Sequence, residues 1–248
     1  MSADAFTFAG LTIPFRSSAD VQQMFDRAVD GRARLRLAIC NANTLMIAKR
    51  RPDYRETLAR MTLLNDGIGL DLGARMCVGA PFPENLQGSD LVPRLIAASA
   101  SPLRIFLLGS RDGVAACAGD VFTSRSPQHT VVGARSGFFE PEDEEALISE
   151  INGSGADVLL VAMGNPLQEM FIMRHTDELE VPVAIGVGAL FDFLSGEVAR
   201  APRWIQQIRL EFLFRLAQEP RRMARRYTVD AAVFLLAVWG EKRTKRGA

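Results

Sequence analysis

Short apolar runs alternate along the chain with longer segments in which apolar and polar positions are mixed. Short apolar runs bounded by turn residues are typical of buried strands, and the mixed segments are typical of helices. The pattern predicts strands over residues 35–40, 61–64, 103–108, 130–132, 157–162 and 183–187. It predicts helices over residues 44–49, 54–60, 91–98, 112–122, 141–151 and 165–175. This alternation indicates an α/β fold, with a parallel sheet covered by helices on both faces.

The last fifth of the chain has a different pattern. Helices are predicted over residues 204–217 and 221–239, and from residue 200 onward Lys and Arg outnumber Asp and Glu about three to one. We therefore expect a Rossmann-like α/β catalytic domain over residues 1–199 and a basic amphipathic helical appendage over residues 200–248. Basic residues beside apolar, Trp-bearing helical faces are typical of a helix that binds an anionic membrane. Two alternatives remain: helices packed on the sheet, and a contact between copies of the chain in a homo-oligomer.

Composition limits the classes of function. The whole chain has 29 basic and 29 acidic residues, so its charge gives no argument for a nucleic-acid partner. Three widely spaced cysteines indicate neither a disulfide framework nor a metal site, and His129 and His175 are expected to be packing or surface residues. We find no signal-peptide pattern and no apolar run long enough to span a membrane. The sequence thus predicts a cytoplasmic protein, peripheral on the inner membrane.

Polar residues follow the predicted strands, where parallel sheets bind their ligands. Asn41 and Asn43 follow the first strand, and their carboxamides can bind phosphate or sugar oxygens, although Asn41 is also a good helix cap. Asp66 follows the second strand, and a carboxylate there suits a general base for a sugar hydroxyl. Its neighbours Asn65 and Gly67 are turn residues, so the local sequence is equally consistent with a simple turn.

A second group of candidates follows the later strands. Gly164 precedes a helix start whose exposed amides attract phosphate, and Gln168 and Glu169 in its first turn are placed to contact a base or ribose. Gly188 allows close approach of a ligand, and Asp192 can accept hydrogen bonds from sugar hydroxyls.

The Gly-Ser-Arg-Asp-Gly loop at residues 109–113, which begins at Gly109, is a weaker candidate. It lacks the Gly-x-Gly-x-x-Gly dinucleotide fingerprint, and the chain has no P-loop pattern. Both absences argue against a nicotinamide enzyme and a P-loop NTPase.

Taken in order, these segments resemble the WecG/TagA/CpsF glycosyltransferase family over about residues 35–227. Each motif is weak alone, and the ordered series is specific. The series comprises Asn-Ala-Asn at 41–43, Asn-Asp-Gly at 65–67, Gly-Ala-Pro at 79–81, Gly-Ser-Asp at 88–90, Phe-Leu-Leu-Gly at 106–109, Gly-Phe-Phe at 137–139, Gly164 with Pro-Leu-Gln-Glu at 166–169, Gly-Val-Gly at 186–188 with Asp192, Arg-Ala-Pro at 200–202, Glu-Phe-Leu-Phe-Arg-Leu at 211–216, Glu-Pro-Arg-Arg at 219–222 and Arg-Tyr at 226–227.

The resemblance implies an inverting glycosyltransferase that needs no metal and no cofactor. It implies transfer of a sugar from a UDP-sugar to a polyprenyl-diphosphate-linked sugar in exopolysaccharide or cell-surface polysaccharide synthesis. Asp66 would be the base, and the nucleotide contacts would come from Asn43, Gln168, Asp192 and the turn formed by Gly137 and Phe138. Arg215 and Arg222 in the appendage would hold the acceptor diphosphate at the membrane.

Three positions depart from the family pattern, and they bear on the donor sugar. Asn41 aligns where the family often has Thr, Asn85 where it has Arg, and Phe138 where it has Tyr. The forms Cys-Asn-Ala-Asn-Thr and Asn-Asp-Gly-Ile-Gly are similar to the xanthan-type exopolysaccharide glucosyltransferase branch, so we predict glucose as the donor sugar. The alternatives are an N-acetylmannosaminyltransferase of the same family, a nucleotide-binding oxidoreductase and a non-enzymatic membrane-associated subunit.

Overall fold

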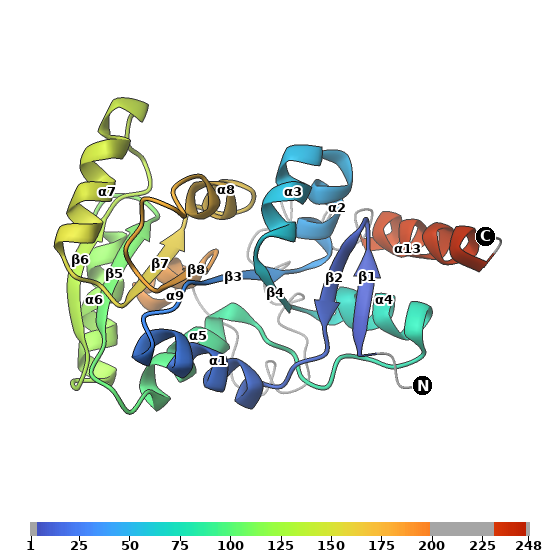
Figure 1. Cartoon of the computed structure of the whole chain (residues 1–248), viewed down its shortest axis with the longest axis horizontal. Coiled ribbons are helices and arrows are strands. Elements are labelled where there is room, and N and C mark those ends of the chain that lie inside the picture. Colours follow the sequence, from blue (N-terminus) through green and yellow to red (C-terminus); the bar gives the residue numbers. More distant parts are fainter. Residues whose placement is uncertain (1–3, 199–230, 247–248) are drawn as a thin grey trace.

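A six-stranded parallel sheet forms the centre of the protein (Figure 1). The computed structural model describes residues 4–198 and 231–246, without the side chains of residues 244–246. The strand order is β4-β3-β8-β7-β5-β6. The strands are β3 (Leu35–Cys40), β4 (Thr62–Asn65), β5 (Arg104–Gly109), β6 (Thr130–Arg135), β7 (Val158–Ala162) and β8 (Val183–Gly186). Each corresponds to a strand predicted from the apolar runs, so the predicted α/β fold is confirmed.

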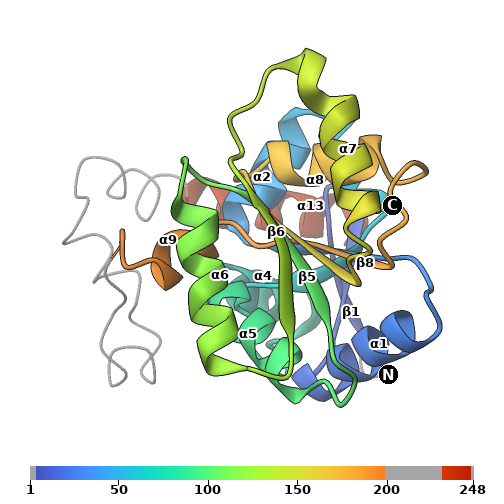
Figure 2. The ribbon, with the colours of Figure 1, turned by 90° about the vertical axis from the view of Figure 1, so that its left-hand side faces the viewer.

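Helices cover both faces of the sheet (Figure 2). One face packs against α2 (Ala42–Arg50), α3 (Pro52–Ala59), α7 (Glu144–Gly153) and α8 (Leu167–Arg174). The other packs against α1 (Ser18–Asp30), α5 (Gly88–Ala98), α6 (Val114–Arg125) and the short α9 (Leu190–Leu194). Within β3, Ala38 and Cys40 belong to the first core cluster and Leu37 and Ile39 to the second. This alternation is the period of two of a strand, and because both faces are buried the strand is apolar at every position except Arg36.

A small antiparallel hairpin was not predicted from the sequence. Its strands are β1 (Ala5–Phe8) and β2 (Leu11–Pro14), and Phe6 and Phe8 are fully buried. Ala9 and Gly10 in the turn both have positive φ, as a tight two-residue hairpin turn requires. Alanine is not a residue that indicates such a turn, so the sequence pattern did not predict the hairpin.

The C-terminal helix α13 (Ala231–Arg246) packs into the core of the domain, against α2 and α4 (Ile68–Val78). Phe234 and Val238 are fully buried, and the Phe234 ring lies 5.2 Å from that of Phe8 in the hairpin. The helix overlaps the end of the predicted helix 221–239. The predicted helix 204–217, Arg215 and Arg222 lie outside the described residues. Across residues 4–198 and 231–246, the structure contains no helix with the length and apolar character needed to span a membrane.

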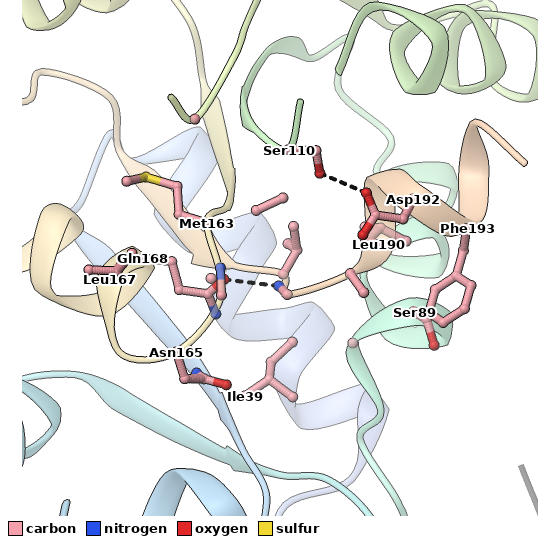
Figure 3. Close-up of a pocket in the computed structure, with 18 of the residues that line it drawn as sticks. Ile39, Ser89, Ser110, Met163, Asn165, Leu167, Gln168, Leu190, Asp192 and Phe193 are labelled. Atoms are coloured by element: carbon pink, nitrogen blue, oxygen red, sulfur yellow. Dashed lines mark hydrogen bonds between the residues drawn. The ribbon is translucent and has the colours of Figure 1, made fainter. Parts of the chain in front are cut away.

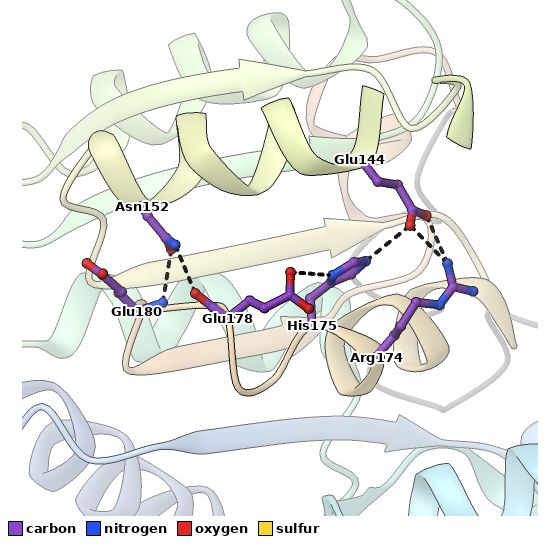
Figure 4. Close-up of polar contacts among 6 residues, drawn as sticks. All are labelled: Glu144, Asn152, Arg174, His175, Glu178 and Glu180. Atoms are coloured by element: carbon purple, nitrogen blue, oxygen red, sulfur yellow. Dashed lines mark hydrogen bonds and ion pairs between the residues drawn. The ribbon is translucent and has the colours of Figure 1, made fainter. Parts of the chain in front are cut away.

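Helix α7, which follows the short 3-10 turn η1 (Pro141–Asp143), is tied to the end of α8 and the loop after it by polar contacts (Figure 4). The ring nitrogens of His175 lie 3.2 Å from a Glu144 oxygen and 3.4 Å from a Glu178 oxygen. Arg174 adds a 2.9 Å ion pair with Glu144. The other histidine, His129, is buried between two backbone groups, so both histidines have structural partners.

Candidate active site

A pocket of about 850 Å³ lies at the carboxyl edge of the sheet (Figure 3). Residues from the segments that follow all six strands line it, which is where ligands bind to open α/β sheets. These residues are Asn41 and Asn43 after β3, Asp66 after β4, Ser110 and Arg111 after β5, Gly137 and Phe138 after β6, Met163 to Asn165 after β7, and Val187 to Ala189 after β8. A cavity of this volume accommodates a ligand of drug size or larger.

The turn that carries Asp66 is fixed from two sides. The Asp66 N–H donates to the carbonyl oxygen of Cys40 at 2.8 Å, which ties the end of β4 to β3. The next N–H, that of Gly67, donates to the side-chain oxygen of Asn85 at 2.7 Å, and Gly67 has φ +87°. Residues 65–67 thus form a turn, and this turn also presents the Asp66 carboxylate to the pocket. Asn85 is not among the lining residues, and its contact in the structure is with this turn.

Asn41 combines the two possibilities that the sequence left open. Its side-chain oxygen accepts the Thr44 N–H at 3.2 Å, and the Thr44 hydroxyl accepts the Asn41 N–H at 3.3 Å, so it caps α2. Asn41 and Asn43 also both line the pocket. The cap therefore holds the first turn of α2 at the edge of the binding site.

Gln168 and Glu169 differ in their relation to the pocket. Gln168 lines it, and its side-chain oxygen accepts the N–H groups of Gly164 at 3.2 Å and Gly188 at 3.1 Å. Glu169 is fully buried and is not a lining residue. Burial raises the pKa of the Glu169 carboxyl above its usual range. The predicted site residues Gly164, Gln168 and Gly188 are brought together, whereas Glu169 lies behind them.

Asp192 on α9 is held by the loop after β5. The Ser110 hydroxyl donates to Asp192 Oδ1 at 3.0 Å, and the Ser110 carbonyl accepts the Gly137 N–H at 3.0 Å.

Gly109 is not among the lining residues. A Cβ on Gly109 would lie 2.5 Å from the backbone of Ala162, so a glycine is needed there for close approach of β5 and β7.

Charge in the described part of the pocket is predominantly negative. Its lining includes the carboxylates of Asp66, Asp192 and Glu197. Arg111 is the cation among the described lining residues, and it forms a 2.7 Å ion pair with Glu197. At the rim, the Phe138 side chain is 77% exposed. Among the residues that the structure describes, no cluster of His, Cys, Asp and Glu has the makeup of a metal site.

Several lining residues were not named individually in the sequence. Ser110 and Arg111 lie in the predicted candidate loop at 109–113, directly after β5, so the rule that identified Asp66 applies to them as well. Ser89 comes from the start of α5, and Glu197 follows α9. Ser89 belongs to the Gly-Ser-Asp segment at 88–90 that was named in the resemblance, whereas Glu197 follows a helix and had no local signal in the sequence.

A parallel sheet whose carboxyl edge forms one polar pocket, with a carboxylate at a strand end, defines an α/β enzyme of the doubly wound class. A comparison with protein families gives the more specific assignment. The family described as "Glycosyl transferase WecG/TagA/CpsF family" matches residues 7–248. The chain therefore belongs to the WecG/TagA/CpsF glycosyltransferase family, and its substrates are a sugar donor and an acceptor.

Proposed function

We propose that the protein transfers glucose from UDP-glucose to a polyprenyl-diphosphate-linked sugar in the synthesis of an exopolysaccharide or other cell-surface polysaccharide. The family membership supports a glycosyl donor and acceptor, and the Asn-Ala-Asn and Asn-Asp-Gly-Ile-Gly forms support glucose. The observation that carries the proposal is the position of Asp66, a carboxylate at a strand end within a pocket lined by backbone and side-chain amides. N-Acetylmannosamine is the alternative donor sugar within the family.

In the proposed reaction, Asp66 acts as the general base. Its carboxylate takes the proton of an acceptor hydroxyl while the hydroxyl oxygen attacks the anomeric carbon of the donor. The bond from that carbon to the β-phosphate oxygen breaks, and UDP leaves with the electron pair. A single displacement inverts the anomeric configuration. The mechanism calls on no cofactor, and hydrogen-bond donors aimed at the leaving phosphate stabilise its developing charge.

The donor nucleotide is proposed to lie along the ends of β6, β7 and β8. Asp192 has one carboxylate oxygen bonded to Ser110, and no hydrogen bond to the other oxygen is seen among the described residues, so we assign that oxygen to the ribose hydroxyls. Asn43, Gln168 and the turn at Gly137 and Phe138 supply further contacts, and the exposed Phe138 ring offers an aromatic face to the base.

The acceptor diphosphate needs more positive charge than the described pocket provides. The described lining contains three carboxylates and one guanidinium, and that guanidinium is already paired with one of the carboxylates. We assign the missing cations to Arg215 and Arg222, because charge-assisted Arg–phosphate hydrogen bonds are strong and geometrically specific. The exposed apolar residues of α13, Leu236 and Trp239, lie on a helix with a basic end. They support a peripheral position on the anionic cytoplasmic face of the inner membrane.

The test is acceptor-dependent release of UDP with a short polyprenyl-diphosphate-linked sugar. We expect release from UDP-glucose, a product of inverted anomeric configuration by NMR, and equal rates with and without EDTA. If UDP is released only from UDP-N-acetylmannosamine, the donor sugar is N-acetylmannosamine and not glucose. No release across a wide panel of donors and acceptors, with protein shown to be folded, would contradict the proposal.

A further inference from the structure

A buried set of hydrogen bonds lies directly behind the pocket and centres on Glu169. The Tyr54 hydroxyl of α3 donates to Glu169 Oε2 at 2.9 Å. The side-chain amides of Asn165 and Gln168 donate to Glu169 Oε1 at 2.6 Å and 2.7 Å. Tyr54 and Glu169 are both 0% exposed, and burial raises the pKa of each. A buried carboxyl group is tolerated only when its oxygens are hydrogen-bonded, and here three donors meet that need.

Gln168 connects this buried set to the pocket. While its Nε2 donates to Glu169, its Oε1 accepts the N–H groups of Gly164 and Gly188. Those two glycines belong to the loops after β7 and β8, which come together at the pocket (Figure 3). A Cβ on Gly186 would lie 2.7 Å from Gln168 Nε2, so the amide packs closely against the end of β8.

The orientation of the Gln168 amide depends on the chemistry of its partners. A side-chain amide has an acceptor end and a donor end. The two glycine N–H groups can only donate, and an ionised Glu169 can only accept. Flipping the amide would therefore place donor against donor and acceptor against acceptor. A neutral amide at position 169 would remove the part of this restriction that Glu169 imposes, because it can accept in one orientation and donate in the other. Only the two glycine N–H groups would then favour the observed orientation.

We propose that Glu169 is a positioning residue that acts through Gln168. Its carboxylate fixes the orientation of the Gln168 amide, and the amide then holds the two loops that shape the donor side of the pocket. Tyr54 and Asn165 keep the carboxylate in place. Glu169 itself does not contact the substrate. The expected effect on donor affinity rests on the proposed function, whereas the effect on the loops does not.

The first experiment measures the loops directly in the full-length protein. Glu169→Gln and Tyr54→Phe are compared with Leu58→Val, a control in the same helix as Tyr54 at a fully buried apolar position. We expect amide hydrogen exchange at Gly164 and Gly188 to become about 10-fold faster in Glu169→Gln. This factor corresponds to the loss of one hydrogen bond to a charged group. Tyr54→Phe should give a smaller change in the same direction. Leu58→Val should leave both amides unchanged.

The second experiment measures UDP affinity and the coupling between the two residues. Glu169→Gln should raise the Kd for UDP and the KM for the donor about 10-fold, with a smaller change in kcat. Combining it with Gln168→Ala should add nothing beyond the effect of Gln168→Ala alone, because residues in one network are not additive.

Two results would overturn the proposal. One is unchanged exchange at Gly164 and Gly188 in both Glu169→Gln and Tyr54→Phe. The other is full additivity of Glu169→Gln and Gln168→Ala in UDP affinity. If Glu169→Gln does not fold, Tyr54→Phe decides the exchange experiment. A wild-type protein that binds no UDP would contradict the proposed function, and the exchange experiment would still decide the role of Glu169.

Discussion

Two of the three carboxylates that line the pocket have different surroundings. Asp192 accepts a hydrogen bond from the Ser110 hydroxyl, whereas Asp66 projects from a turn whose backbone is held by Cys40 and Asn85. A carboxylate held by a neighbouring hydroxyl suits binding, and one in a rigid turn suits proton transfer at a fixed point. The two residues should therefore affect different kinetic constants.

Replacing Asp66 by Asn should lower kcat by about 10²- to 10⁴-fold, because the amide cannot accept the acceptor proton. The Kd for UDP should change by less than about threefold, since the side chain keeps its size. Asp192→Asn is the matched control, and it should raise the Kd for UDP with a smaller loss of kcat. Isothermal titration and steady-state kinetics measure both. Full kcat in Asp66→Asn would remove Asp66 from the role of base.

Sequence position after a strand predicted which residues line the pocket more reliably than it predicted what each one contacts. Asn43 and Asp66 lie just after strands and are lining residues, as expected from that position, whereas Asp192 lines the pocket from α9. Glu169 follows Gln168 directly, and the two look equivalent in sequence. Their difference depends on Tyr54, which lies 115 residues earlier and covers Glu169 from α3. Such long-range burial leaves no local pattern.

At the scale of elements, continuous burial made the central strands predictable. β3 and β7 are buried along their whole length, so they are uniformly apolar, with Arg36 as the exception. Helix α4 was not predicted, because Ile68 and Leu72 are exposed while Asp71 is buried. Its sequence therefore lacks the separation of apolar and polar faces by which an amphipathic helix is identified.

The contact between β5 and β7 depends on Gly109. Gly109→Ala should lower the free energy of unfolding by about 2 kcal/mol or more, because Gly109 has φ +142° and its Cβ would meet backbone that cannot move aside. Gly153→Ala is the control. Gly153 lies in the last turn of α7 with open space around it, so alanine should be neutral or stabilise by up to about 1 kcal/mol. Urea denaturation measures both, and equal midpoints for the two variants would contradict this account.

For the whole molecule, α13 determines how the ends of the chain meet. Phe234 is fully buried against the hairpin and α4, so Phe234→Ala should cost about 3–5 kcal/mol of folding free energy. Leu236 on the same helix is 66% exposed, and Leu236→Ala should change stability by less than about 0.5 kcal/mol. Thermal unfolding of the two variants measures the difference. Similar melting temperatures would mean that α13 contributes little to the core.

The exposed side of α13 is expected to carry membrane affinity. Trp239 is 49% exposed, and Arg243 lies 4.6 Å from its ring. The double variant Leu236→Gln and Trp239→Gln should weaken co-sedimentation with phosphatidylglycerol vesicles about 10-fold or more, since it removes two large apolar side chains from the interface. Phosphatidylcholine vesicles serve as the control for charge, and they should bind the wild type weakly. If the double variant co-sediments with the vesicles as well as the wild type does, the membrane contact lies elsewhere on the protein.

The packing of Phe234 against Phe8 also has a consequence for biosynthesis. Of the two partners, the ribosome makes the hairpin first and α13 more than 200 residues later. Until α13 emerges, Phe8 lacks the ring that covers it in the finished protein. Nascent chains and prematurely terminated fragments thus present an apolar surface that chaperones and proteases recognise. Helix α13 thereby makes synthesis of the chain through α13 a condition for a sealed core.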